Sequence, residues 1–114
     1  MRTIAILLTL FYSAFSYSSS SIHCKGDINN TWVDSSGLLL ISATWATKPI
    51  GLCKVSTKHN NIEPDTCKTW VSIALSALTS KKPTTIQYFN VTSCSEVLGY
   101  SSSQQPNYLM IRNE

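Results

Sequence analysis

Four cysteines, at Cys24, Cys53, Cys67 and Cys94, are the residues of this chain whose type and spacing bear most directly on chemistry. No Cys-x-x-Cys pair occurs, and His23 beside Cys24 has no second histidine at a ligand spacing, so the pattern does not predict a zinc site. Because residues 1–18 read as a signal peptide, four thiols on the small domain that follows predict two disulfides instead. We therefore expect no metal and no cofactor.

The pairing of these cysteines is open among three connectivities. The helix expected after Cys67 advances roughly 20 Å, and the strand expected after it runs back about 23–27 Å. That return would bring Cys94 close to Cys67, so geometry favours Cys67–Cys94, and Cys24–Cys53 follows by elimination. The rival pairing is Cys53–Cys94 with Cys24–Cys67.

Catalysis would require a positioned acid, base or nucleophile. Beyond its first 18 residues the chain has two histidines, His23 in an expected tail and His59 in a polar loop, and its many serines show no nucleophile-elbow signature. We therefore expect that the protein is not an enzyme. A small secreted hydrolase that depends on His59 is the alternative.

Aromatic side chains among polar neighbours are the candidates for binding. Trp32 stands among asparagines and an aspartate, and Tyr100 follows a glycine and precedes a serine run, so we expect both rings to be exposed. Such rings suit the apolar faces of sugars, while nearby amides and hydroxyls suit sugar oxygens. Ordinary half-buried loop aromatics are the alternative. Trp45 and Trp70 are predicted to point into the core, from a strand and a helix respectively.

Composition and the first residues bound the class of protein. The chain has 114 residues, of which 43% are hydrophobic and 13% charged, with a formal net charge of +3. This balance predicts neither disorder nor a nucleic-acid partner. Residues 1–18 read as a signal peptide, because Arg2 precedes an apolar run too short for the ~20 residues of a spanning helix. We expect a single domain, residues 19–114, that is secreted or periplasmic with no membrane span after cleavage.

One helix is the clearest element of that domain. Asp65 or Thr66 is the predicted N-cap, with Pro64 just outside the helix or in its first turn, and Pro83 stops the helix. Its apolar residues recur at helical spacing. The stripe consists of Trp70, Ala74, Ala77 and Leu78, widened by Val71 and Leu75.

Branched and aromatic residues predict strands on both sides of the helix. Residues 19–23 are expected to be a frayed terminus. The expected strands are 30–33, 37–47, 50–57, 84–91 and 108–112. The order β-β-β-α-β-β predicts an α+β fold: a small five-stranded OB-like barrel with the helix between strands three and four, or else a half-open sheet with one packed helix.

A pattern around the helix also resembles known proteins. Its residues are Cys67-Lys68-Thr69-Trp70, Ala74, Ala77, Ser80-Lys81-Lys82-Pro83, Ile86-Gln87-Tyr88, Cys94 and Pro106-Asn107-Tyr108. The pattern resembles a group of short secreted proteins of Gram-negative bacteria. More remotely, the layout is similar to the B subunits of bacterial AB toxins of the subtilase-cytotoxin and pertussis-like kinds. That resemblance implies an OB fold, oligomeric rings and binding of surface glycans, and it transfers no individual binding residue.

These observations favour binding over catalysis. We expect an exported binding domain for a glycan or cell-surface ligand, with Trp32 and Tyr100 as candidate contacts and assembly into an oligomer left open. The alternative is a periplasmic or secreted protein that binds or inhibits another envelope or secreted protein.

Overall fold

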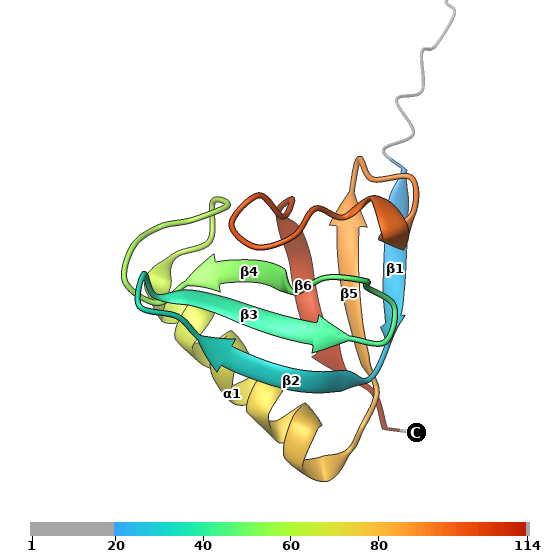
Figure 1. Ribbon diagram of the computed structural model, residues 1–114, viewed down its shortest axis with the longest axis horizontal. Coiled ribbons are helices and arrows are strands. Elements are labelled where there is room, and N and C mark those ends of the chain that lie inside the picture. The colour runs from blue at the N-terminus through green and yellow to red at the C-terminus, as the bar shows by residue number, and fades with distance from the viewer. Residues whose placement is uncertain (1–19, 114) are drawn as a thin grey trace, which may run out of the picture.

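The computed structural model describes residues 20–113. Within them the strands form two antiparallel sheets, ordered β1-β5-β6 and β2-β3-β4, whose strands cross steeply (Figure 1). The predicted α+β class and the predicted helix are confirmed, whereas the expected signal peptide, residues 1–18, lies outside the described residues. In chain order the elements are β1 (Ser21–Gly26), β2 (Ile28–Val33), β3 (Leu38–Ala43), β4 (Ile50–Lys54), α1 (Pro64–Ser80), β5 (Thr84–Phe89), the 3-10 turn η1 (Cys94–Glu96) and β6 (Pro106–Ile111).

Strand β1 is the element that the sequence pattern did not predict. Ser21 and the residues after it, expected to fray, pair along their whole length with β5, beginning with Ser21 opposite Phe89. The described chain therefore has six strands rather than the predicted five. The two sheets do not close into a barrel, so the five-stranded OB-like barrel is not confirmed. Of the alternative, a half-open sheet with one packed helix, the packed helix is present, while the strands divide between two three-stranded sheets.

A tight corner carries the chain from the first sheet into the second. The Asp27 N–H donates to the Thr44 hydroxyl at 3.0 Å, and the Thr44 N–H donates to the Asp27 carbonyl at 3.0 Å. A side chain on Gly26 would collide with that same hydroxyl. The corner between β1 and β2 therefore requires glycine for close backbone approach.

Helix α1 begins earlier than predicted: its N-cap lies two residues before Asp65 and three before Thr66, the two predicted caps. Glu63 is the N-cap and Pro64 the first helical residue, a position where the missing proline N–H costs nothing. Asp65 and Thr66 consequently lie inside the first turn rather than at the cap. The helix ends at Lys81, whose left-handed backbone (φ 55°) directs its N–H to the Ala77 carbonyl.

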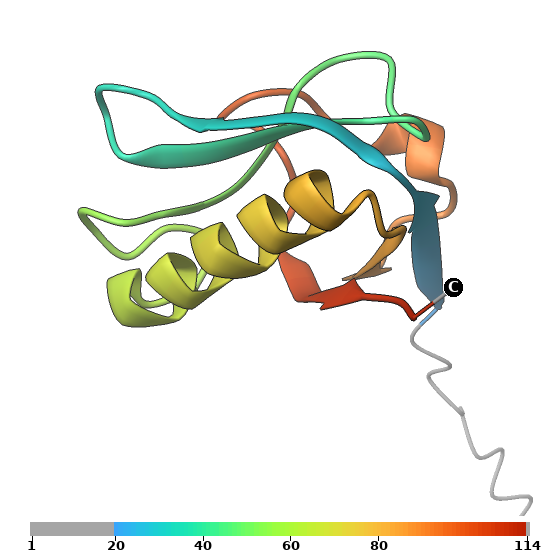
Figure 2. The same ribbon diagram turned by 90° about the horizontal axis from the view of Figure 1, so that it is seen from below.

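The predicted apolar stripe of α1 faces the β2-β3-β4 sheet (Figure 2). Trp70, Ala74 and Ala77 are buried as predicted, whereas Leu75 is 48% exposed and does not widen the stripe into the core. The helix and the inner faces of both sheets together form one core. Its fully buried large side chains include Leu39, Ile41, Ile50, Leu52, Ile86 and Tyr88.

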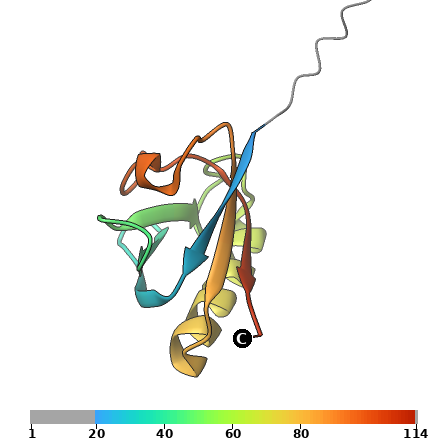
Figure 3. The same cartoon turned by 90° about the vertical axis from the view of Figure 1, so that its right-hand side faces the viewer.

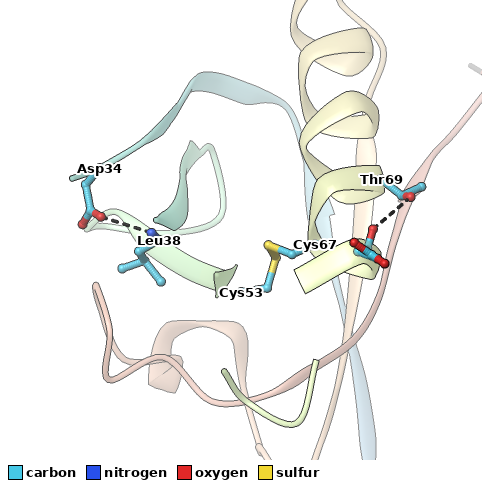
Figure 4. Close-up of a disulfide and its surroundings, with 6 residues drawn as sticks. Asp34, Leu38, Cys53, Cys67 and Thr69 are labelled. Atoms are coloured by element: carbon cyan, nitrogen blue, oxygen red, sulfur yellow. Dashed lines mark hydrogen bonds between the residues drawn. A yellow bond between two sulfur atoms is a disulfide. The ribbon is translucent and has the colours of Figure 1, made fainter. Parts of the chain in front are cut away.

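The hairpin between β2 and β3 is organised by one carboxylate. The Asp34 Oδ1 accepts the backbone N–H of Ser36 at 2.9 Å and that of Leu38 at 3.1 Å (Figure 4). It also accepts the Ser36 hydroxyl at 2.6 Å. The pKa of the Asp34 carboxyl lies below its ordinary value, mainly because the Ser36 hydroxyl donates to it. The two backbone N–H groups and the charge of Lys54 lower the pKa further.

Both pairings considered from the sequence are wrong. The disulfides are Cys24–Cys94 and Cys53–Cys67, each with a Cα–Cα distance of 5.6 Å. Cys67 lies in the first turn of α1 beside the end of β4, which holds Cys53 (Figure 4). The return strand β5 belongs to the other sheet and leads to η1, which packs against β1. Cys94 therefore meets Cys24 on the strand that the sequence pattern missed.

The two disulfides close loops of different length, and we expect their removal to destabilise the fold unequally. In the chain-entropy model, the bond with a separation of 70 residues contributes about 4.5 kcal/mol and the bond with a separation of 14 about 3 kcal/mol. Urea unfolding of the double variants Cys24→Ala/Cys94→Ala and Cys53→Ala/Cys67→Ala should show the larger loss for the first. Peptide mapping of the unreduced wild type is the control, and a Cys67–Cys94 peptide would contradict the structure.

Candidate binding site

The two aromatic residues singled out from the sequence are both exposed, as predicted, but they do not come together. Trp32 is 39% exposed and Tyr100 is 56% exposed. Trp32 lies on β2, at one edge of its sheet, and Tyr100 bridges Ile50 of β4 at the opposite edge. The whole width of a three-stranded sheet separates them, so they cannot contact one small ligand together.

Trp32 borders an apolar hollow between the free edge of β2 and helix α1. The hollow has a volume of about 170 Å³. Two of the residues that line it, Val33 at 41% and Leu75 at 48% exposure, are large apolar side chains open to solvent. The lining also includes Thr31, Leu39 and Val71. This setting is apolar and differs from the polar one that the sequence suggested for Trp32.

Tyr100 projects from a firmly held loop. The Ser103 hydroxyl accepts the Gly51 N–H at 3.0 Å and contacts the Tyr100 carbonyl at 2.9 Å. The Asn60 side chain donates to the Ser103 carbonyl at 3.0 Å. A Cβ on Gly51 would collide with the Tyr100 carbonyl. The Tyr100 backbone is therefore fixed, but none of the surface hollows described here includes its ring.

The other two tryptophans belong to the core, as predicted. Trp70 is buried, and Trp45 is partly buried against the core. The Trp45 ring meets the ring of Tyr88 edge-on, with centroids 6.2 Å apart, an arrangement that stabilises aromatic pairs.

Neither histidine is part of a nucleophile–base pair in residues 20–113. His59 is half-buried in the β4–α1 loop, and its Nε2 has no hydrogen-bond partner among residues 20–113. Desolvation, followed by the charge of Lys54, lowers the pKa of His59. His23 contacts an amide instead of a hydroxyl or carboxylate. The same residues contain no group of three His, Cys, Asp or Glu side chains that could hold a metal ion.

A different set of candidate residues lies on the outer face of the β1-β5-β6 sheet, whose three strands are seen in Figure 3. His23, Gln87 and Tyr108 stand in one row across the three strands. The Gln87 Nε2 lies 3.4 Å from the His23 Nε2, and the His23 and Tyr108 rings have centroids 6.3 Å apart. Two rings thus flank a central amide.

A β-bulge adds a second amide to this row. Gln87 pairs with Tyr108 while Tyr88 pairs with Pro106, so Asn107 is the extra residue of β6. Bulges redirect side chains in this way. The Asn107 Nδ2 donates to the Gln87 Oε1 at 2.6 Å, which fixes the orientation of both amides.

Beside the row lies a polar hollow of about 280 Å³, lined by Phe89, Asn90, Gln105 and Asn107. Phe89 follows Gln87 by two positions on β5, so it shares the outer face, and its ring is 44% exposed. Asn90 has a left-handed backbone (φ 60°), which asparagine tolerates better than most residues. We call His23, Gln87, Tyr108 and these four residues the amide–aromatic face.

The loop that forms one wall of the hollow is anchored to its surroundings. The Gln104 Oε1 accepts the Leu98 N–H at 2.9 Å, and its Nε2 donates to the Glu96 carbonyl at 3.2 Å. Pro106, which begins β6, is fully buried. Gln105 is held between these two fixed neighbours, so the wall is preformed.

Sequence reasoning did not find this face. Phe89 and Tyr108 were assigned to strands, and His23 to a frayed tail. The one local signal is the density of amides around aromatic residues, in Gln104-Gln105-Pro106-Asn107-Tyr108 and in Gln87-Tyr88-Phe89-Asn90. Only the pairing of β1 and β6 with β5 brings the segments together.

Comparisons with family models, curated proteins and solved structures found no match for this chain. Among residues 20–113, no helix combines the length and the hydropathy that a bilayer span requires. The two disulfides are consistent with an oxidising compartment.

The lowered pKa of His59 predicts a pH dependence of stability. The native state binds the proton less readily than the unfolded chain, so protonation favours unfolding. The free energy of unfolding should be unaffected by this group well above its ordinary pKa of about 6.5 and should fall as the pH drops below that value. Asp34, whose pKa is lowered from 3.8, acts only at lower pH. Between pH 7.5 and 5.0 the free energy of unfolding, measured with urea, should decrease less in His59→Gln than in wild type. Equal decreases would show that His59 does not cause this pH dependence.

Proposed function

We propose that this protein is an exported binding module that recognises a glycan on a cell surface through its amide–aromatic face. The observation that carries the proposal is the hollow beside Phe89, where an exposed ring is surrounded by three amide side chains and no charged one. A ring can stack on the apolar C–H face of a sugar, and amides both donate to and accept from sugar hydroxyls. The predicted leader supports export.

We further propose that the fold is an open variant of the OB arrangement. The turn at Gly26–Asp27 makes β1 and β2 two halves of one bent strand, with β1 paired to β5 and β2 to β3. Counted in this way, five strands remain, and α1 lies between the third and the fourth, as in an OB fold. This likeness is consistent with the resemblance to toxin B subunits, but a fold alone does not identify a ligand.

The size of the hollow sets the expected strength of binding. Its volume, about 280 Å³, lies near the lower end of the range for small-molecule sites and suits about one sugar ring. A ring of roughly 15 non-hydrogen atoms, at about 0.3 kcal/mol each, gives a dissociation constant on the order of 1 mM. Biological binding would then depend on several contacts acting together.

Binding to multivalent glycan conjugates tests the proposed site. Phe89→Ala and Asn107→Ala should each weaken binding roughly fivefold to tenfold, because each removes about 1 kcal/mol of stacking or hydrogen bonding. Trp32→Ala is the matched control, since Trp32 is an aromatic residue of similar exposure on the other sheet. Loss of binding in Trp32→Ala alone would move the site to β2, and absence of binding across a broad glycan array would exclude the function.

A second candidate function, protein binding, is favoured by the edge of β2. No strand within residues 20–113 pairs with this edge, and its sequence, INNTWV, contains neither the lysine nor the proline that commonly protects free edges. Beside it lies the apolar hollow of Trp32, Val33 and Leu75. An extended segment of another protein, with apolar residues at alternate positions, could pair with the edge and fill the hollow.

A lysine placed on this edge should prevent such pairing. With the intact protein as bait for envelope extracts, Val33→Lys should lose a stoichiometric partner that wild type retains, because the charge would be desolvated in the hollow. Met110→Lys, at an equally exposed position on β6 (43%, against 41% for Val33), is the matched control. If light scattering shows a dimer, a second copy of this chain occupies the β2 edge instead. A monomeric protein that retains no partner from the extract would contradict the proposed protein-binding function.

A further inference from the structure

We infer that the amide–aromatic face selects an uncharged, N-acetylated sugar in its hollow and contacts a second sugar over the His23–Gln87–Tyr108 row. The inference rests on the proposed glycan-binding function and specifies its ligand. Three features of the face carry it: the four residues that line the hollow are uncharged, two amides there make no side-chain hydrogen bond within residues 20–113, and Asn107 joins the hollow to the row.

The lining of the hollow disfavours an anionic sugar. Its four residues, Phe89, Asn90, Gln105 and Asn107, are all uncharged. Lys25 is on the same face, but it stands opposite Thr85, four positions from Phe89 along β5, or about 13 Å away. A carboxylate or sulfate in the hollow would lose hydration without gaining a cationic partner from these four side chains, which is costly. Uncharged sugars carry no such penalty.

The amides of the hollow match an acetamido group. Within residues 20–113, the side chains of Asn90 and Gln105 make no hydrogen bond, so each offers both a donor and an acceptor to a ligand. An acetamido group presents one N–H, one carbonyl and one methyl group. The methyl group can contact the exposed Phe89 ring while the polar atoms pair with the two amides.

Asn107 connects the hollow to the row. One amide hydrogen of Asn107 is committed to the Gln87 Oε1, and Gln87 in turn lies between the rings of His23 and Tyr108. A second sugar linked to the first would lie over Gln87 with a ring on either side. The hydrogen bond that Asn107 donates to Gln87 holds Asn107 at the boundary between the two sugars.

The test compares four probes by ligand-detected NMR titration of the intact protein. N,N′-diacetylchitobiose is the uncharged, acetylated disaccharide, N-acetylglucosamine its monosaccharide, cellobiose the disaccharide without acetamido groups, and N-acetylneuraminic acid an acetylated sugar with a carboxylate. We expect diacetylchitobiose to bind at least tenfold more tightly than cellobiose or N-acetylneuraminic acid. Asn90→Gly, which removes the amide and tolerates the left-handed backbone at this position, should reduce that preference for the acetylated disaccharide.

The variants separate the two sugar positions. His23→Ala should weaken diacetylchitobiose roughly threefold to fivefold and leave N-acetylglucosamine unchanged, whereas Phe89→Ala should weaken both. Trp32→Ala is the control and should change neither. Because His23 and Phe89 are exposed or at the surface, the urea midpoint of each variant can confirm that it is folded.

The outcomes distinguish this inference from the function on which it rests. If cellobiose or N-acetylneuraminic acid binds as tightly as diacetylchitobiose or more tightly, the proposed selectivity is wrong. If Phe89→Ala abolishes that binding, glycan binding at this face is still supported. An equal effect of His23→Ala on both acetylated probes would overturn the second sugar position. If none of the four probes binds, the inference fails, and a broad glycan array without any binding would remove the proposed function as well.

Discussion

The pairing of β1 with β5, fixed by the Cys24–Cys94 disulfide, is the constraint on which the rest of the structure depends. Side chains alternate between the two faces of a strand. Cys24 therefore points into the core, where it is fully buried, and His23 points outward to Gln87. The same bond ties η1 to β1, and so holds the start of the long loop that includes Gln105 and leads to Asn107 on β6. One disulfide thus supports both the core and the face opposite it.

Local chemistry made part of this fold predictable. Helical spacing identified Trp70, Ala74 and Ala77 as a buried stripe. The apolar face of a helix is set by local periodicity and does not depend on how the strands pair. Leu75 was wrongly predicted to extend this stripe. Helical spacing gives the direction in which a side chain points, but it does not give the width of the sheet that covers the helix. Leu75 lies just past the edge of β2, where the cover ends.

Long-range pairing was not predictable, and the site depends on it. The segment at Ser21 is polar and lies at the start of the domain, so nothing local distinguishes a paired strand from a loose end. A Cys67–Cys94 bond would require β5 to return alongside α1, whereas β5 belongs to the other sheet. The bulge at Asn107 is likewise a property of two strands together. Phe89, Asn90 and Asn107 could not be grouped without these facts.

The two candidate surfaces have opposite chemistry and belong to different sheets. The β2 edge offers unpaired backbone groups and an apolar hollow, and the amide–aromatic face offers hydrogen-bonding side chains around exposed rings. Apolar burial can supply most of the affinity for a protein, whereas a shallow amide site discriminates among ligands but binds each weakly. A partner on β2 would leave the other sheet open to solvent. Attachment at β2 and recognition at β1-β5-β6 are therefore compatible, and attachment to an assembly with several copies would raise the effective concentration of a weak sugar site.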